Sequence, residues 1–269
     1  ELSPRQEADW VAAMQDAICP ALNATRTLGA LGGIIASRIA REFQLGGPSF
    51  AVSCEEASGL KGLEVAVRAL RSREMDTVVV GAVDLATDSR AAMTTAGNVD
   101  KHVGDGAAAL IVKRLSDALR DQDRVYAVIR GLGHASGDAI KGPAALLRAC
   151  EDAGVKAATI GLVEFAGNAE IAPGVEAGFS GISQPAAISF SADRFGHCGA
   201  AAGLASLVRA ALCVHHATLP GSQANLPSFG GQPGTFHFPI EPQYWLRDRA
   251  DGPRRAMVCA TTSDGNSSC

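Results

Sequence analysis

The apolar residues of this chain follow two patterns, the spacing of amphipathic helices and the short apolar runs of buried strands. Helices are predicted at residues 7–18, 34–43, 60–70, 141–154 and 199–216. Strands are predicted at residues 50–52, 77–83, 104–115, 125–131, 160–165, 187–190 and 255–260. The strand at 77–83 is apolar throughout, so we expect it to be buried on both faces. Because strands and helices alternate, the pattern predicts a layered α/β fold.

Three further stretches are predicted to lack regular structure. Residues 23–33 are rich in glycine and are expected to form a loop that leads into a helix. Residues 116–123 form a polar connector, and the residues after 260 form a polar tail.

Composition narrows the class of protein. The chain has 269 residues, of which 47% are hydrophobic and 19% charged, as expected for one or two domains with a sizeable core. A net charge of −4 gives no reason to expect nucleic acid or an anionic membrane as a partner. No apolar run approaches the roughly 18 residues of a membrane span. Residues 1–7 are polar with mixed charge, unlike a signal peptide. We therefore expect a cytoplasmic protein.

The cysteines and histidines give no sign of a metal site. The seven cysteines form no CxxC pair and lie mostly in apolar runs, so we expect buried, reduced thiols. Metal-ligand spacing with any acidic or thiol partner is absent for His134, His215, His216 and His237. No bound cofactor or metal is expected.

The most informative stretch runs from Gly46 to Leu70. Gly46, Gly47 and Pro48 form a turn, residues 50–52 a short buried strand, and a sharp corner then leads into the helix. Ser58 is expected to be the N-cap of that helix. Free backbone N–H groups and the helix dipole favour an anion there, so such corners are where enzymes place nucleophiles.

This stretch resembles the active-site elbow of β-ketoacyl synthases, the condensing enzymes of fatty acid and polyketide assembly. Their motif is Gly-Pro-Ser, a few strand residues, and Asp-Thr-Ala-Cys-Ser-Ser ahead of an apolar helix. When the motif is aligned on Gly47-Pro48-Ser49 and Leu60, the nucleophilic cysteine falls on Glu56. The nearby thiol, Cys54, lies two residues earlier, inside the predicted strand. Two other segments, residues 30–39 and 104–115, also match family motifs.

The resemblance spans nearly the whole chain and implies a thiolase-like fold, a layered αβαβα arrangement of two similar halves. It makes residues 1–269 one incomplete ketosynthase-like domain, with the first half at 1–115 and the second at 116–269. The family's opening strand and first helices have no counterpart before Glu1, and its closing strand has none after Cys269. We therefore expect the N-terminal part of the first half to be missing.

Family members also use two histidines, which stabilise the enolate and the developing oxyanion. The first lies in Val-Glu-Ala-His-Gly-Thr-Gly-Thr, and its position here is Ala166. The second lies in Lys-Ser-Asn-Ile-Gly-His-Leu-Glu and is retained as His197, but the Lys is replaced by Ala192 and the Glu by Gly199. Thr262 replaces the gating phenylalanine of the late Gly-Phe-Gly-Gly-Thr-Asn loop. Together with Cys54, Thr262 is expected to line the acyl pocket.

Two candidate catalytic residues remain, and each has a second interpretation. Glu56 is either a charge stabilised at a helix N-terminus or a permanent plug that imitates a carboxylate bound in the pocket. His197 is either catalytic or a packed structural histidine. Cys54 is expected to be buried and unreactive, because its displacement should carry the sulfur away from the helix end.

The resemblance implies a non-condensing, chain-length-factor-like domain of a fatty acid or polyketide synthase that shapes the acyl pocket of an active ketosynthase. The sequence around Glu56 is most similar to the degenerate ketosynthase domains of polyunsaturated fatty acid synthases. Two alternatives stay open. One is a residual enzyme that transfers acyl groups or decarboxylates with Glu56 and His197. The other is a scaffold for an acyl carrier protein or neighbouring domains.

The same resemblance implies the partners. Substrates would arrive on the phosphopantetheine of an acyl carrier protein. In family dimers the strand at the elbow, here Phe50 to Ser53, pairs across a two-fold axis. An unpaired apolar edge strand is a liability in solution, so we expect a dimer with itself or with an active ketosynthase.

Overall fold

The computed structural model describes residues 3–85, 87, 103–136, 144–166, 179, 185–222, 235–262 and 265–269. The chain divides into two compact units, Glu1–Ala51 and Val52–Cys269. The second unit contains every candidate site residue named above.

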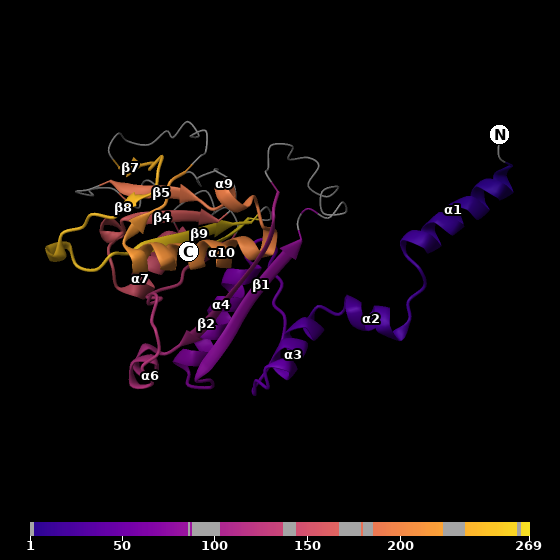
Figure 1. The fold of residues 1–269 in the computed structure, drawn as a ribbon, viewed down its shortest axis with the longest axis horizontal. Coiled ribbons are helices and arrows are strands. Elements are labelled where there is room, and N and C mark those ends of the chain that lie inside the picture. The colour runs from indigo at the N-terminus through magenta and orange to yellow at the C-terminus, as the bar shows by residue number, and fades with distance from the viewer. Residues whose placement is uncertain are drawn as a thin grey trace. The chain divides into compact units, whose positions relative to one another are not determined.

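The first unit is a series of helices, α1 (Pro4–Ile18), α2 (Ala24–Ala30) and α3 (Gly33–Glu42), visible in indigo in Figure 1. Helix α1 begins with a capping box, in which the Ser3 hydroxyl accepts from the backbone of Gln6 and the Gln6 side chain accepts from the backbone of Ser3. The predicted helices at 7–18 and 34–43 are confirmed. The predicted loop at 23–33 is wrong in part, because Asn23 caps α2 by accepting from the Arg26 N–H.

The second unit is built on a six-stranded sheet in the order β3-β10-β9-β4-β5-β7 (Figure 1). Its strands are β3 (His134–Ser136), β4 (Leu162–Ala166), β5 (Ala186–Phe190), β7 (Phe236–His237), β9 (Ala256–Thr261) and β10 (Asn266–Ser268). Strands β9, β4, β5 and β7 are parallel, whereas β10 is antiparallel to both β9 and β3. Helix α7 (Ala144–Ala153) packs on this sheet through a core that includes Leu146, Val163 and Phe190.

A second sheet pairs β1 (Thr77–Leu85) with β2 (Asp105–Lys113) in antiparallel register, with Val80 opposite Leu110. Helices α4 (Ser58–Arg71) and α10 (Ala202–His216) contact each other, α4 packs on β1, and α10 packs on β2, β4 and β9. Leu63 of α4 and Leu204 of α10 are both fully buried in the resulting cluster. The two helices therefore form a layer between the two sheets, as the layered α/β prediction requires.

The remaining elements are short. They are α6 (Leu115–Arg120), α9 (Ala192–Phe195), the strand pair β6 (Thr218–Leu219) and β8 (Gln243–Tyr244), and single 3₁₀ turns at Ala157–Thr159, Gly199–Ala201 and Arg249–Asp251.

Several predicted elements differ from the structure. Residues 50–53 are described but form no strand, and Phe50 is exposed. Residues 125–131 form no strand either. The polar connector at 116–123 contains α6, and the polar tail contains β10, because its backbone pairs with β3 and β9 despite its serines. Helix α7 begins at Ala144, and the predicted start at 141–143 lies outside the described residues.

Strand β1 is buried on one face and not on both. Val80 is 6% exposed, whereas Val79 and Val83, which point to the opposite face, are 45% and 54% exposed. Ile111 of β2 lies on the same open face and is also exposed. The open face is therefore apolar, and β1 gives no polar signal that distinguishes it from a strand covered on both sides.

Candidate functional site

The turn before α4 is held by Ser58. Its hydroxyl accepts from the Cys54 N–H at 2.8 Å and donates to the Glu55 carbonyl at 2.6 Å. Glu55 has a φ of 45°, in the left-handed region that non-glycine residues rarely adopt. Ser58 is the first residue of α4, and the N-cap is Ala57, so the prediction of Ser58 as N-cap is wrong by one position. The hydroxyl closes the turn and does not cap the helix.

Glu56 is half-buried immediately before α4. Ala57 offers no capping side chain to the first N–H groups of the helix, so a carboxylate at this end is favoured by the dipole, by roughly 0.3–1 kcal/mol. Cys54 is half-buried within the same turn and lies outside any strand. The prediction of a buried Cys54 in a strand is therefore wrong.

The other cysteines follow the sequence only in part. Cys150, Cys198, Cys213 and Cys259 are buried, as predicted, and all seven cysteines are free thiols. Cys19 is exposed and Cys269 is half-buried, against the expectation of burial.

Three of the predicted site positions lie at one edge of the large sheet. Ala166 ends β4 and pairs with Ala260 of β9, and Thr262 directly follows β9. Ala192 lies two residues after β5, at the start of α9. Because β4, β5 and β9 are parallel, their carboxyl ends meet at the same edge. The structure therefore brings Ala166, Ala192 and Thr262 to that edge.

His197 is half-buried in the segment between α9 and α10. Its backbone forms a bridge with Val103, and its carbonyl accepts from the Gly104 N–H at 3.2 Å. Its Nδ1 atom accepts from the Gly199 N–H at 3.1 Å. Because Nδ1 accepts this bond, the proton of the ring is assigned to Nε2.

The segment that follows His197 meets both the sheet edge and the start of α4. Ala166 packs against a buried cluster formed by Cys198, Ala201 and Ala202. A Cβ added to Gly59 of α4 would lie 3.1 Å from the carbonyl oxygen of Ala200. The helix end that carries Glu56, the His197 segment and the edge with Ala166 are thus neighbours in one unit.

Asp84, near the end of β1, is a site residue that the sequence did not single out. Its Oδ2 accepts from the Ala200 N–H at 2.8 Å. Gly199 has a φ of 46°, and a Cβ there would lie 2.1 Å from the same oxygen. The Asp84 carboxylate thus occupies the space into which a side chain at position 199 would extend. The sequence did carry one signal for Asp84, a carboxyl residue in an otherwise apolar strand.

Thr262 is buried and closes the turn between β9 and β10. Its hydroxyl accepts from the Asn266 N–H at 2.8 Å, and its own N–H donates to the Asn266 carbonyl at 2.8 Å. Residues 263–264 within this turn lie outside the described residues. A hydroxyl bound in this way supports the loop, and its predicted role in an acyl pocket stays a prediction.

The described residues show neither a metal site nor a membrane span. No group of three or more His, Cys, Asp or Glu side chains among them could hold a metal ion. None of the helices that the structure describes is long and apolar enough to cross a membrane.

Comparison with protein families identifies the family of this chain. The model of the β-ketoacyl synthase N-terminal domain matches residues 7–98, and that of the β-ketoacyl synthase C-terminal domain matches residues 126–225. The chain belongs to the β-ketoacyl synthase family. The family predicted from the motifs around Glu56 and His197 is confirmed.

Curated relatives of this ketosynthase domain are large synthases. It is 30% identical, over 86% of its length, to a phthioceranic/hydroxyphthioceranic acid synthase of Mycobacterium bovis, of which it covers 12%. It is 32% identical, over 86% of its length, to a PKS-NRPS hybrid synthetase of Aspergillus niger, of which it covers 15%. The chain thus spans less than a fifth of the length of these relatives.

Solved ketosynthases share its fold. A ketosynthase from module 6 of the bacillaene synthase of Bacillus subtilis superposes with a TM-score of 0.76 at 24% identity, over 92% of this chain and 52% of that one. An oxazolomycin ketosynthase domain of Streptomyces albus gives a TM-score of 0.75 at 23% identity, over 87% and 48%. The predicted thiolase-like ketosynthase fold is confirmed.

Proposed function

We propose that this ketosynthase domain does not condense acyl and malonyl units and that it acts as a chain-length-factor-like partner of an active ketosynthase. The observation that supports this proposal is the set of side chains at the site. Glu56 stands at the helix end where the family has its thiol, and Ala166 at the sheet edge where it has its first histidine. Ala192 likewise lies where the family has its lysine.

The chemistry of condensation explains why these changes matter. The acyl group must be held as a thioester on a thiolate, and a carboxylate in its place would form a labile anhydride. The methyl groups of Ala166 and Ala192 donate no hydrogen bond to an enolate or an oxyanion. Removal of one such donor costs about 10²–10³ in rate in a well-studied protease. Cys54 does not replace the lost thiol, because it lies within the turn and before the helix end.

The relatives suggest in which kind of larger protein this domain works. Two of them are named as a phthioceranic/hydroxyphthioceranic acid synthase and a PKS-NRPS hybrid synthetase, and the chain covers only a small part of each. We infer that the domain works within, or beside, a polyketide or fatty acid synthase whose acyl carrier protein presents substrates on phosphopantetheine. Paired with an active ketosynthase across a two-fold axis, it would contribute residues to the floor of the partner's acyl pocket.

Condensation is tested with the wild type and with Glu56→Cys, which restores a thiol at the helix end. The full chain is incubated with acyl and malonyl carrier proteins, and product is followed by mass spectrometry beside an active ketosynthase as positive control. We expect no condensation by the wild type or by Glu56→Cys, because the single variant still lacks the groups at positions 166 and 192. Chain extension by Glu56→Cys alone would contradict the proposal.

A second candidate function is decarboxylation without condensation, and the tautomer of His197 favours it. With Nδ1 accepting from Gly199, the Nε2–H is a donor that could stabilise an enolate. Release of carbon dioxide from malonyl carrier protein by the wild type, lost in His197→Ala and retained in the control Cys54→Ser, would support this candidate over the first.

The partner is tested separately by sedimentation velocity at micromolar concentration. We expect a dimer of the chain or, with a co-expressed active ketosynthase, a stable mixed pair. A monomer that associates with no ketosynthase would remove the partner role and favour a scaffold that binds carrier protein or neighbouring domains.

A further inference from the structure

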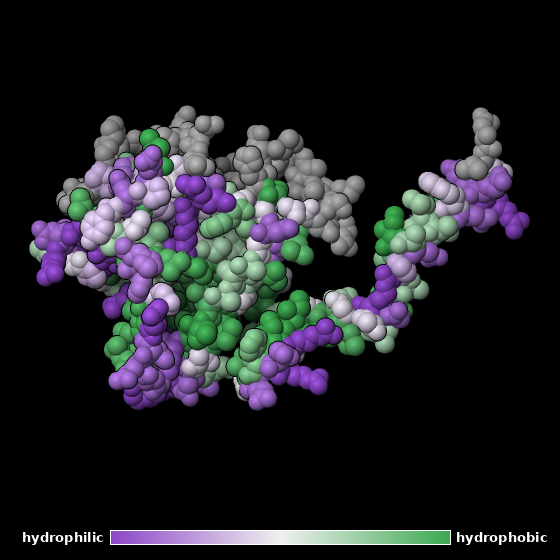
Figure 2. All heavy atoms as spheres, in the orientation of Figure 1, coloured by the Kyte–Doolittle hydropathy of each residue, from purple (hydrophilic) through white to green (hydrophobic). Residues whose placement is uncertain are grey.

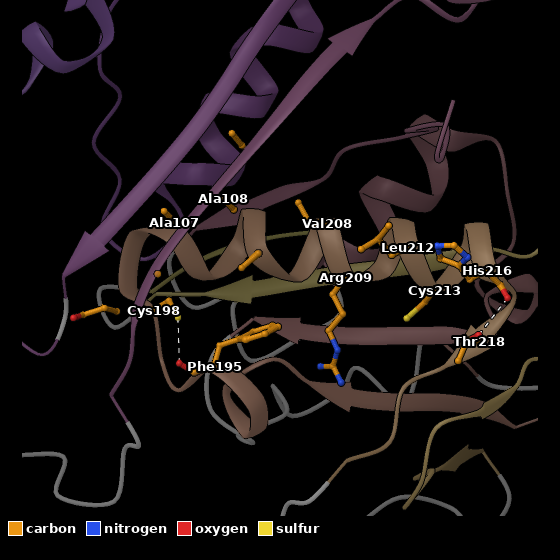
Figure 3. A pocket seen from close by; sticks show the side chains of 14 residues that line it. Ala107, Ala108, Phe195, Cys198, Val208, Arg209, Leu212, Cys213, His216 and Thr218 are labelled. Carbon is orange, nitrogen blue, oxygen red and sulfur yellow. Dashed lines mark hydrogen bonds between the residues drawn. The ribbon is translucent and has the colours of Figure 1, made fainter. Parts of the chain in front are cut away.

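An elongated cavity of about 830 Å³ runs along one side of α10, away from the turn that carries Glu56. This groove lies between α10 and β2, with Phe195 and Cys198 toward one end and His216 and Thr218 at the other (Figure 3). The α10 residues that line it are Ala205, Val208, Arg209, Leu212, Cys213 and His216. They follow helical spacing along one face and span roughly 16 Å at about 1.5 Å per residue. The volume is that of a small-molecule site.

The walls of the groove are mostly apolar. Strand β2 contributes Ala107, Ala108 and Ala109, and α10 contributes Val208 and Leu212. Leu212 is 40% exposed, and on the face shown in Figure 2 apolar residues gather over α10 and the β1–β2 pair. An extended hydrocarbon chain laid in the groove would remove this apolar surface from water, which favours binding.

Among the residues that the structure describes, Arg209 is the one arginine that lines the groove, and its side chain is only 13% exposed. Its Nη1 atom donates to Glu164 Oε1 at 2.8 Å and to the Phe190 carbonyl at 3.1 Å. Within the part of the chain that the structure describes, no acceptor meets its Nε or Nη2 atoms. These two atoms form the side edge of the guanidinium, a planar two-donor fork that matches the two oxygens of a carboxylate.

Glu164 is a second polar residue beside the groove whose hydrogen bonding is incomplete among the described residues. The residue is fully buried on β4, and its Oε2 atom has no partner among the described residues. Burial raises the pKa of this carboxyl to about 7, although Arg209 opposes the shift. Near neutral pH the carboxyl is therefore partly protonated, and Arg209 keeps positive charge that is not fully neutralised.

We propose that this groove binds a single-chain carboxylic acid, with the hydrocarbon chain along α10 and the carboxylate held by Nε and Nη2 of Arg209. The apolar walls account for the chain and the unpaired fork for the head group. The proposal is independent of the proposed function, because none of the residues compared with the family's catalytic set lines the groove.

Isothermal titration of the full chain with decanoate tests the proposal, with decan-1-ol and decyl phosphate as matched ligands. We expect decanoate to bind about tenfold more tightly than the alcohol, since hydrogen bonds to charged groups are the stronger kind. Arg209→Lys keeps a cation beside Glu164 but removes the fork, and it should reduce this preference. Decanoate binding should also take up a fraction of a proton near pH 7, measured as a dependence of the heat on the buffer, because the bound anion competes for Arg209 and favours protonated Glu164.

Leu212→Glu provides a test that leaves the buried pair intact. It places a negative charge in the groove at an exposed position, and it should weaken decanoate binding by about tenfold or more. The matched control is Leu147→Glu, on α7, which is 49% exposed and does not line the groove. Equal binding of decanoate and decan-1-ol, tighter binding of decyl phosphate, or equal effects of the two glutamate variants would each overturn the proposal.

Discussion

Replacement of Gly199 is the sharpest test of the site geometry, because two separate costs meet there. The first is conformational, since a φ of 46° is unfavourable for any residue with a Cβ. The second is steric, since that Cβ would lie 2.1 Å from Asp84 Oδ2, far inside van der Waals contact. The motif resemblance places the family's glutamate at this position, so Gly199→Glu asks whether this chain can accept that side chain.

The two costs can be estimated separately. The left-handed conformation should cost Gly199→Ala about 1–2 kcal/mol of unfolding free energy. To admit the methyl group, Asp84 must move away and give up the hydrogen bond from the Ala200 N–H, a bond to a charged acceptor worth about 1.5–3 kcal/mol. We therefore expect Gly199→Ala to destabilise the second unit by about 3–5 kcal/mol, and Gly199→Glu by at least as much.

Gly154 supplies the matched control. It also has a positive φ, 63°, but a Cβ there would meet nothing within 4 Å, so Gly154→Ala should cost only the conformational 1–2 kcal/mol or so. Urea unfolding followed by circular dichroism measures both variants, and a double-mutant cycle with Asp84→Ala measures the coupling. Equal losses for the two alanine variants, or a coupling near zero, would refute the placement of Asp84 against position 199.

Two further predictions concern titratable groups. Glu64 Oε2 lies 3.0 Å from His134 Nε2, and both residues have a lowered pKa. Burial lowers the pKa of His134. Burial alone would raise the pKa of Glu64, but a hydrogen bond from a neighbouring lysine and nearby positive charge outweigh it. Lowered folded-state pKa values mean that stability is lost as the pH falls, below 6.5 for His134 and below 4.5 for Glu64, so the urea midpoint should drop on acidification. Between pH 6.5 and 4.5 the drop should be larger in Glu64→Gln, because the charge of Glu64 opposes the lowering of the His134 pKa. Iodoacetamide should label exposed Cys19 first, half-buried Cys54 more slowly and Cys213 last, because burial raises the pKa of Cys213 to about 11; peptide mass spectrometry that finds Cys213 labelled first would contradict this order.

Much of the helical structure could be predicted from the sequence, because amphipathic spacing and burial agree there. The apolar positions at Leu60, Leu63 and Leu70 predicted the face of α4 that is buried. The parallel strands β4, β5 and β9 were predicted as well, since most of their residues are apolar, as is typical of strands covered on both faces.

The strand predictions that differ from the structure have a common physical cause. Whether such a segment forms a strand depends on partners that lie far away in the chain. Strand β10 is a run of asparagine and serines that pairs with β3 and β9, so its own residues carry no strand signal. Residues 50–52 are apolar but lie in no sheet of this structure. Val79 and Val83 are apolar and exposed, and composition alone does not distinguish such a strand from a buried one.

The positions of the site that lie within the family motifs could be predicted from the sequence. The contact that a residue of β1 makes with the start of α10 could not. The motifs gave the positions of Glu56, Ala166 and His197, and the fold brings their segments together. The sequence marks Asp84 as a carboxyl residue in an apolar strand, but its contact with Ala200 could not be predicted, because the two residues are 116 positions apart.

The relation between Asp84 and Gly199 bears on how this ketosynthase domain could lose its chemistry and keep its fold. The glutamate expected at position 199 would stand where helix α10 begins to form, and its loss removes a carboxylate from that end. Asp84 supplies a carboxylate from β1 and accepts from the Ala200 N–H, a group otherwise left unpaired near the start of α10. Helix α10 packs against β4, β9 and α4 with this carboxylate near its start. The contact fits the proposal made above, in which the domain is retained for its surfaces and pockets and not for condensation.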